Sequence, residues 1–190
     1  LEENGQGPAN GAMIVTGATG GVGSIAIEML ASKGYDVVAL TGKSDQHDYL
    51  RELGASDFVD RGSLEMGSRP LEKALWGGAV DNVGGEVLGW LTRTVKPWGS
   101  IASIGNVGGI KLETTVLPMI LRGVSLLGIN SIEMSNELRN RAWSRLATDL
   151  KPAHLDMISG RTIDFDMLPE AFSPYIDGRV TGRTVVRISD

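Results

Sequence analysis

A burst of glycines separates two apolar runs near the start of the chain, in the stretch MIVTGATGGVGSIAIEML from Met13 to Leu30. The first run is apolar or β-branched, as is typical of a buried strand, and the second has helical spacing. Each glycine adds to the conformational entropy lost on folding, so four glycines within seven residues call for a reason beyond a turn. A strand that enters a helix through such a loop indicates an α/β domain.

The same rhythm continues along the chain. Strands are expected at 12–17, 35–42, 56–60, 77–85 and 99–109, and helices at 24–34, 44–55 and 86–95. Gly34 is the expected C-cap of the first helix, and Ser44 or Asp45 the N-cap of the second. Apolar strands that alternate with helices predict a parallel sheet covered on both faces. With right-handed crossovers, the predicted fold class is a Rossmann-type, doubly wound α/β sheet.

The glycine loop is the first candidate site. In the G-x-G-x-x-G register its positions are Ala18, Gly20 and Gly23, with alanine in place of the first glycine. Glycines let the backbone approach a pyrophosphate, and a helix start offers unpaired N–H groups to it. A tight turn without ligand is the other interpretation of this pattern. The predicted phosphate-binding residues are Gly17, Ala18, Thr19, Gly20, Gly21, Val22 and Gly23.

The end of the second expected strand bears on which dinucleotide binds. An NAD site usually carries Asp or Glu about 20 residues after the glycines, on the ribose hydroxyls. Here Thr41, Gly42, Lys43 and Ser44 stand there instead. A hydroxyl and an ammonium suit a 2′-phosphate that a carboxylate would repel, which favours NADP(H) over NAD(H). Lys43 also fits a solvated helix start capped by Ser44.

Two later glycine loops, DNVGGE at 81–86 and SIGNVGG at 103–109, follow the fourth and fifth expected strands. Ligands of open α/β sheets bind at the carboxyl ends of the strands. Asn82, Val83, Gly105 and Asn106 are therefore the candidates for flanking the nicotinamide ribose and ring. Ordinary turns would have the same composition.

Composition narrows the remaining function classes. A net charge of -5 and a pI near 5.1 argue against a nucleic-acid partner. No apolar run approaches the roughly 18 residues of a membrane span, and no signal sequence stands at the start. The chain has no cysteine and only His47 and His154, so no metal site is expected. The expected location is cytoplasmic.

Three segments are expected. Residues 1–12 are polar and rich in Gly, Pro and Asn, as is typical of a helix end and a linker. Residues 13–134 form the dinucleotide-binding domain. Residues 135–190 begin with a charged helix at 136–151, which Pro152 stops, and continue with a strand, a short helix, a glycine turn and a final strand. These last pieces need not join the central sheet.

Several blocks together carry a family resemblance, namely VTGATGGVGS, ALTGK, YLRELGAS, GAVDNVGG, TTVLPMILRGVSLLGINS and GRVTGRTVV. They occur in order over nearly the whole chain from Met13. The chain resembles the quinone-oxidoreductase-like medium-chain dehydrogenase/reductases, and within them most closely the zinc-free acrylyl-coenzyme A reductase branch. Lys43, where arginine is commoner, and Met119, where an aromatic residue is usual, depart from the pattern.

The resemblance implies an NADPH-dependent reductase that passes hydride to an activated carbon–carbon double bond of a small-molecule substrate. It implies that Gly20 to Gly23 line the pyrophosphate and that Thr41, Gly42 and Lys43 line the 2′-phosphate. It also implies an N-terminal GroES-like half, absent here, to which the segment 135–190 would return. The run GVSLLGI at 123–129 would be an edge strand that pairs in a homodimer, or else a buried internal strand.

Two alternatives stand beside this interpretation. A short-chain dehydrogenase needs Tyr with Lys four positions later, but Tyr35, Tyr49 and Tyr175 are followed at that spacing by Ala, Leu and Arg. A non-catalytic NADPH-sensing module remains open. Hydride transfer depends chiefly on the cofactor and its orientation, and no side chain stands out as an acid, so no catalytic residue is predicted.

Overall fold

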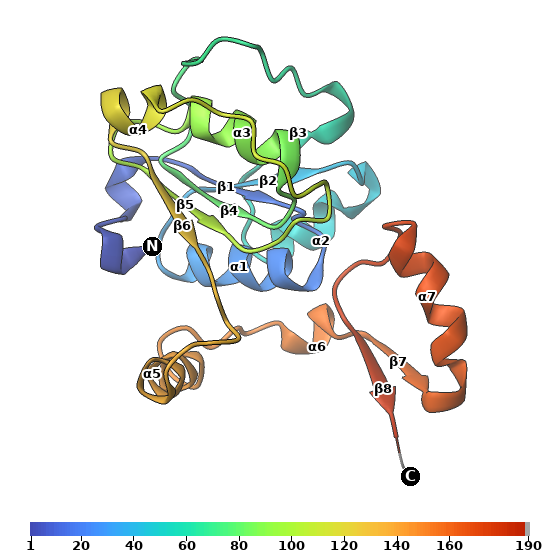
Figure 1. Cartoon of the computed structure of the whole chain (residues 1–190). Helices are drawn as coiled ribbons and strands as arrows, with labels where there is room; N and C mark the ends of the chain where they lie inside the picture. Colours follow the sequence, from blue (N-terminus) through green and yellow to red (C-terminus); the bar gives the residue numbers. More distant parts are fainter. Residues whose placement is uncertain (189–190) are drawn as a thin grey trace.

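Six parallel strands form the central sheet in the computed structural model, which describes residues 1–188 (Figure 1). The strands are β1 (Met13–Thr16), β2 (Val37–Thr41), β3 (Asp57–Asp60), β4 (Gly78–Asp81), β5 (Ser100–Ser103) and β6 (Ser125–Gly128). Their order is β3-β2-β1-β4-β5-β6, and every neighbouring pair is parallel. This order winds outward from β1 in both directions, so the predicted Rossmann-type fold is confirmed.

Helices cover both faces of the sheet. On one side, α1 (Gly21–Ser32) and α2 (His47–Glu52) pack on Met13 and Val15, which are fully buried. On the other, α3 (Gly85–Thr94) packs on Ile14, also fully buried, with α4 (Leu117–Arg122) beside it. Successive side chains of β1 therefore enter opposite cores, which is why the strand is apolar without interruption.

The start of the second helix differs from the prediction. A short 3₁₀ turn, η3 (Ser44–Gln46), precedes α2, and neither Ser44 nor Asp45 caps the helix through its side chain. Gln46 holds the N-cap position instead. The prediction of a Ser44 or Asp45 cap was wrong, because one extra turn separates the Gly42–Lys43 loop from the α-helix proper.

The strand at 125–128 lies at the edge of the sheet. β6 pairs with β5 alone and its side chains are only partly covered, so the buried internal alternative for this run is wrong. At the opposite edge, β3 runs into η4 (Arg61–Ser63). A long connection without regular structure then leads to β4 (Figure 1).

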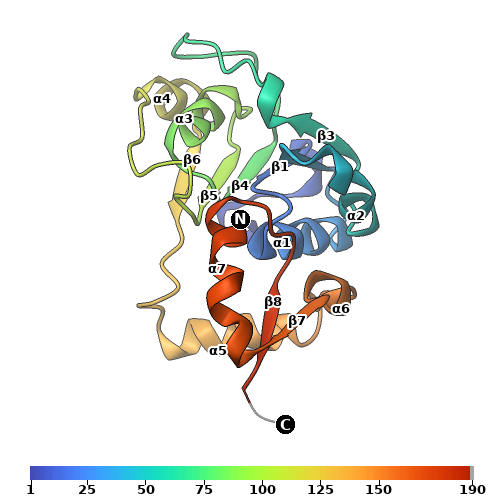
Figure 2. The same ribbon diagram turned by 90° about the vertical axis from the view of Figure 1, so that its right-hand side faces the viewer.

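The strands of the C-terminal segment lie outside the central sheet. The segment comprises α5 (Asn136–Leu146), α6 (Leu155–Ile158), β7 (Arg161–Asp164), η5 (Phe165–Met167), α7 (Leu168–Ile176) and β8 (Thr184–Arg187). β7 and β8 pair in parallel as a two-stranded sheet of their own, beside α7 and apart from the central sheet (Figure 2). At the other end of the chain, η1 (Glu2–Asn4) and η2 (Pro8–Asn10) precede β1.

Part of this segment packs back on the domain. Ile158 is 2% exposed in the core beneath α1, and the N–H of Gly182 donates to the carbonyl oxygen of Thr19 at 2.8 Å. Gly182 also forms a β-bridge with Gly20. The chain near residue 182 thus lies against the glycine loop. Among the described residues, no helix combines the length and the apolar character needed to cross a membrane.

Candidate functional site

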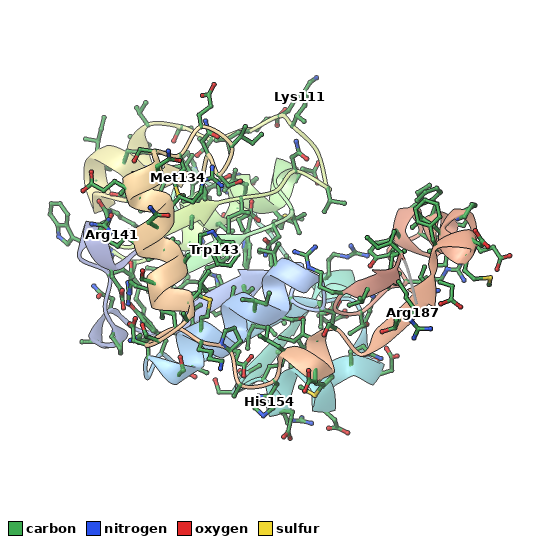
Figure 3. The ribbon with its side chains drawn as sticks, turned by 90° about the horizontal axis from the view of Figure 1, so that it is seen from below. Lys111, Met134, Arg141, Trp143, His154 and Arg187 are labelled. Atoms are coloured by element: carbon green, nitrogen blue, oxygen red, sulfur yellow. The ribbon has the colours of Figure 1, made fainter. Side chains whose placement is uncertain are left out.

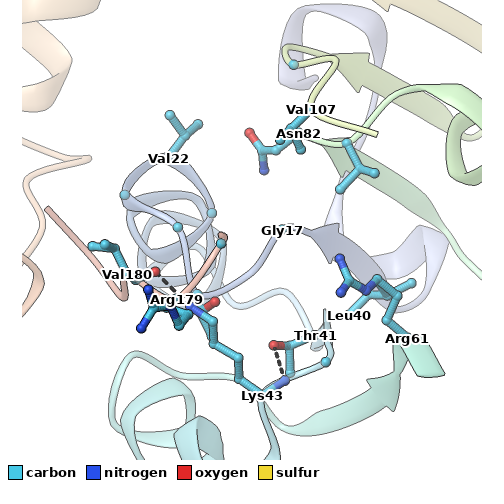
Figure 4. A pocket seen from close by; sticks show the side chains of 18 of the residues that line it. Gly17, Val22, Leu40, Thr41, Lys43, Arg61, Asn82, Val107, Arg179 and Val180 are labelled. Carbon is cyan, nitrogen blue, oxygen red and sulfur yellow. Dashed lines mark hydrogen bonds between the residues drawn. The ribbon is translucent and has the colours of Figure 1, made fainter. Parts of the chain in front are cut away.

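A cleft of about 780 Å³ opens at the carboxyl edge of the sheet, where the strand order reverses beside β1 (Figure 4). Its walls are the loops after β1, β2, β4 and β5, the start of η4 after β3, and the segment from the end of α7 to β8. The lining residues are Gly17, Thr19, Gly20, Gly21, Val22, Gly23, Leu40, Thr41, Gly42, Lys43, Arg61, Asn82, Val83, Ile104, Gly105, Val107, Ile176, Asp177, Gly178, Arg179, Val180 and Arg183.

The predicted site residues meet in this cleft, with two exceptions. Ala18 is fully buried behind the glycine loop, where its carbonyl oxygen accepts from the hydroxyl of Ser24 at 3.3 Å. Asn106 is exposed on the loop after β5 and is not among the lining residues. Loops far apart in the sequence therefore converge as the strand pattern predicted, because parallel strands end at one edge.

The glycine loop is shaped by close backbone contacts. Gly17 has a φ of 58°, which favours glycine, and a Cβ on Gly23 would collide with the carbonyl oxygen of Gly17. The N–H of Gly20 donates to that same oxygen at 3.0 Å. α1 begins at Gly21 without a side-chain cap, so the amides of its first turn stay available. The loop and the helix start together make a cradle for an anion.

Two cations line the cleft after the ends of β2 and β3, and we call Lys43 and Arg61 the cationic corner. The Lys43 ammonium donates to the carbonyl oxygen of Val180 at 2.7 Å, and its backbone N–H donates to Thr41 Oγ1 at 3.1 Å. The guanidinium of Arg61 lies 3.5 Å from where a Cβ on Gly42 would stand. Burial, and then the nearby Arg61 charge, lower the pKa of Lys43, while Asp45 opposes the shift.

The wall formed by the C-terminal segment adds two more arginines. The side chain of Arg183 lies against Gly21, in the space that a Cβ there would fill. Arg179 donates to the carboxylate of Asp177 at 2.6 Å. Asp177 is the acidic residue among those lining the cleft. Arg61, Arg179 and Arg183 were missed by the sequence reasoning. Only Arg61 left a signal, since it directly follows the third expected strand, at 56–60.

The loop after β4 is held by a buried polar network. Asp81 is fully buried, and its carboxylate accepts from Thr16 Oγ1 at 2.6 Å, from the N–H of Val83 at 3.2 Å and from the N–H of Gly84 at 2.9 Å. The N–H of Asn82 donates to Thr16 Oγ1 at 3.0 Å. The network fixes the loop that carries Asn82 and Val83 into the cleft.

Both histidines lie outside the cleft. His47 stacks on Phe58, with ring centroids 4.0 Å apart, and Nδ1 of His154 lies 2.7 Å from Glu28 Oε1. Within residues 1–188, no group of three or more His, Cys, Asp or Glu side chains is placed to hold a metal ion.

Known proteins are similar to this chain over its full length. It is 44% identical over 189 residues to quinone oxidoreductase YhfP of Bacillus subtilis, and 43% identical over 190 residues to acrylyl-CoA reductase AcuI of Ruegeria pomeroyi. These alignments cover 99% and 100% of this chain but 57% of either relative. The chain thus spans little more than half the length of these relatives.

Solved structures give the same result. The structure of YhdH from Escherichia coli K-12 with bound NADPH matches with a TM-score of 0.94 at 41% identity, and it covers 100% of this chain and 58% of that one. The structure of YhfP with NAD bound matches with a TM-score of 0.93 at 44% identity, over 99% of this chain and 57% of that one.

A family described as zinc-binding dehydrogenase matches residues 21–148, most of the chain. The zinc in that description has no counterpart among the described residues, which offer no ligand cluster. This match excludes the alternative that the chain is a short-chain dehydrogenase. The chain belongs to the zinc-binding dehydrogenase family, as a cofactor-domain homologue of its quinone oxidoreductase and acrylyl-CoA reductase members.

Proposed function

We propose that this chain is the NADP(H)-binding domain of a zinc-independent reductase that reduces an activated carbon–carbon double bond. One observation carries the cofactor proposal. A protein of net charge -5 gathers Lys43, Arg61, Arg179 and Arg183 around one cleft, with Asp177 as the acidic residue among the described lining. Such a concentration of cations suits a ligand with several phosphates.

The glycine loop suits the diphosphate of that ligand. The cradle between Gly17 and Gly23 is closed to a Cβ at Gly23, while the first turn of α1 keeps its amides available. Backbone N–H groups at a helix start attract phosphate oxygens through hydrogen bonds and through the helix dipole. Val22, whose side chain is partly exposed, and Thr19 complete this part of the lining.

The cationic corner supports NADP(H) rather than NAD(H). Gly42 follows β2 where an NAD site usually carries a carboxylate, and Lys43 and Arg61 flank it. The planar fork of Arg61 can bind a phosphate with two parallel hydrogen bonds, and this offsets the loss of a fork at Lys43. The structure of YhfP has NAD bound, so the preference of this chain for NADP(H) has to be measured directly.

The reaction class rests on the relatives. AcuI is named an acrylyl-CoA reductase and YhfP a quinone oxidoreductase. The bound cofactor would supply hydride, and the residues of this chain would bind it, orient it and expose its reactive face. We assign no catalytic residue, and acrylyl-CoA, a quinone and another enone all remain candidate acceptors.

The finer organisation is also proposed. Residues 13–134 would bind the cofactor, residues 1–12 would link, and residues 135–190 would return to a substrate-binding half. Because the chain spans 57% of its relatives, we assign it the cofactor-binding step rather than the whole reaction. A cytoplasmic location and a homodimer are further proposals, and the open edge of β6 supports the second.

The test is a calorimetric titration of this chain with NADPH and with NADH. We expect NADPH to bind about 10- to 100-fold more tightly, since charge-assisted hydrogen bonds to the 2′-phosphate contribute roughly 1.5 to 3 kcal/mol. With an enone acceptor added, we expect little or no oxidation of NADPH. Equal affinities would contradict the specificity, and the absence of binding by both would contradict the cofactor proposal.

A further inference from the structure

One hydrogen bond joins the cationic corner to the C-terminal segment. The Lys43 ammonium donates to the carbonyl oxygen of Val180 at 2.7 Å, a contact between residues 137 positions apart (Figure 4). Val180 belongs to residues 176–183, most of which line the cleft and which we call the tail wall. An ammonium carries three N–H donors, so two remain for another acceptor in the cleft. Lys43 can therefore hold the tail wall and a ligand at the same time.

Two backbone amides report whether the tail wall is docked on the glycine loop. The N–H of Gly182 donates to the carbonyl oxygen of Thr19 at 2.8 Å, and the N–H of Arg183 donates to the carbonyl oxygen of Ile158 at 2.6 Å. Such amides exchange with solvent when their hydrogen bonds open locally. Their exchange rates therefore measure how often the tail wall lifts from the loop.

Electrostatic repulsion opposes this docking unless an anion lies between the two sides of the cleft. The sheet side carries Lys43 and Arg61, and the tail wall carries Arg179 and Arg183. Asp177 is the acidic residue among the described lining, and its carboxylate accepts from Arg179. Positive charges thus line both sides, and a phosphate between them replaces repulsion by attraction.

The two candidate cofactors differ at this place. NADP(H) has a 2′-phosphate, which the proposed function puts at Lys43 and Arg61, whereas the diphosphate that both cofactors share lies on the glycine loop. Only NADP(H) therefore brings an anion to the ammonium that bonds to Val180. An ammonium already held by Val180 has lost much of its freedom, so the phosphate pays less entropy to order it.

We propose that Lys43 binds the 2′-phosphate and Val180 at the same time, so that NADP(H), and not NAD(H), fixes the tail wall over the glycine loop. The inference rests on the proposed cofactor and goes beyond it, because it makes the C-terminal segment part of the selection between the two cofactors. By linkage, a docked tail wall raises the affinity for the 2′-phosphate by the same factor as the phosphate favours docking.

The experiment measures hydrogen exchange at Gly182 and Arg183 with adenosine 2′-monophosphate and with adenosine 5′-monophosphate, at equal saturation of the protein. Both probes carry one phosphate, in the first at the site of the 2′-phosphate and in the second at that of the diphosphate. We expect the 2′ probe to slow exchange at the two amides at least about fivefold more than the 5′ probe, the lower end of the usual coupling between sites. Exchange in β1 and β4 should be the same with either probe.

Two variants of the cationic corner separate the bond to the tail wall from the affinity for phosphate. Lys43→Met and Arg61→Met each remove one cation, so both should weaken binding of the 2′ probe, and each is measured at the concentration that restores equal saturation. Lys43→Met should lose the additional protection at Gly182 and Arg183. Arg61→Met should keep it, because among the described residues it is Lys43 that bonds to Val180.

The converse effect is measured in Gly182→Ala. A Cβ on Gly182 would collide with the carbonyl oxygen of Ile158, so this variant forces the tail wall away from its docked position. Its affinity for NADP⁺ should fall at least about fivefold more than its affinity for NAD⁺, as linkage requires. Unchanged exchange in β1 shows that the sheet of the variant is folded.

Four results would overturn the proposal. They are equal protection by the two probes in wild-type protein, additional protection that survives in Lys43→Met, its loss in Arg61→Met, and equal losses of affinity for the two cofactors in Gly182→Ala. Failure of the proposed function is a different outcome, in which wild-type protein binds neither NADP⁺ nor the 2′ probe, and the inference then fails with it.

Discussion

The two walls of the cleft are built in different ways. The sheet wall consists of the loops after β1, β2, β4 and β5, together with Arg61 after β3. The residues of β1, β2, β4 and β5 themselves are almost wholly buried. The tail wall, residues 176–183, crosses the glycine loop without joining the central sheet. The sheet wall takes its shape from the core of the sheet. The tail wall takes its shape from the hydrogen bonds that attach it to the rest of the chain.

Hydrogen bonds attach the tail wall to the rest of the chain. The N–H of Gly182 donates to Thr19, the N–H of Arg183 donates to the carbonyl oxygen of Ile158 at 2.6 Å, and Val180 accepts from Lys43. Both walls therefore carry cations, but only the sheet wall carries the glycine loop. The sheet wall supplies the cradle, while the tail wall contributes Arg179 and Arg183, and it is the easier of the two to displace.

Damage to the sheet wall should have the largest effect. In Gly23→Ala the new Cβ meets the carbonyl oxygen of Gly17 and the backbone of Ala18, neither of which can move without opening the loop. We expect a loss of about 1 to 3 kcal/mol in the free energy of unfolding. Affinity for NADPH should also fall at least about tenfold. Chemical denaturation and calorimetric titration measure the two effects.

Gly128→Ala is the control for this prediction, because nothing lies within 4 Å of a Cβ there. It should leave both quantities almost unchanged. A Gly23→Ala protein with wild-type stability and wild-type affinity would show that the loop has room to spare, and the contrast between the two walls would then lose its basis.

The cationic corner gives the next largest effect. In Lys43→Asp a carboxylate replaces an ammonium beside Arg61, so we expect NADPH affinity to fall roughly 10- to 100-fold while NADH affinity is spared. Lys73→Asp makes the same charge change at an exposed residue outside the cleft and should alter neither. Equal losses for both cofactors in Lys43→Asp would remove Lys43 from the 2′-phosphate site.

The pH dependence follows from the same residue. Burial lowers the pKa of Lys43, so the ammonium is lost at a less alkaline pH than an exposed lysine would require. The preference for NADPH should therefore be complete below this pKa and decline as the pH rises through it. Lys43→Met should show a flat ratio of the two affinities over the same range, and an equal decline in the variant would assign the titration to another group.

The sheet wall could be predicted from sequence because its signals are local. The hydrophobic periodicity and the turn residues locate the end of each strand, and the carboxyl ends of parallel strands lie at one edge of the sheet. Gly17, Lys43 and Asn82 therefore line one cleft, as expected. The edge position of β6 could not be decided in this way. Its residues are apolar whether the strand is internal or at an edge.

The tail wall could not be predicted, because its contacts join residues more than a hundred positions apart. Arg183 reaches Gly21 and Lys43 reaches Val180 only after α5, α6 and α7 have turned the chain back. The Ser44 cap failed for a local reason. One 3₁₀ turn lies between the loop and the helix, and residue propensities do not show whether such a turn is present.

The anchor of the C-terminal segment should give the smallest effect on binding. The Glu28 side chain, on α1, is 8% exposed, and its Oε1 accepts from the N–H groups of Ala153 and His154 at 2.7 and 2.9 Å and contacts the His154 ring. Figure 3 shows His154 at the base of the domain, where α6 meets α1. From there the chain runs through Ile158, which accepts from Arg183.

In Glu28→Ala these amides lose their acceptor, at a cost of about 1 to 3 kcal/mol that falls on the C-terminal segment rather than on the sheet. Hydrogen exchange should therefore speed up at 153–158 and 182–183 and stay unchanged in β1 and β4. NADPH affinity should fall only a few-fold, since the cradle is intact. Glu86→Ala, an exposed acid on α3, should change neither. If Glu28→Ala instead accelerated exchange in β1 as much as at 182–183, the tail wall and the sheet wall would be one cooperative unit, and the distinction between them would be one of sequence alone.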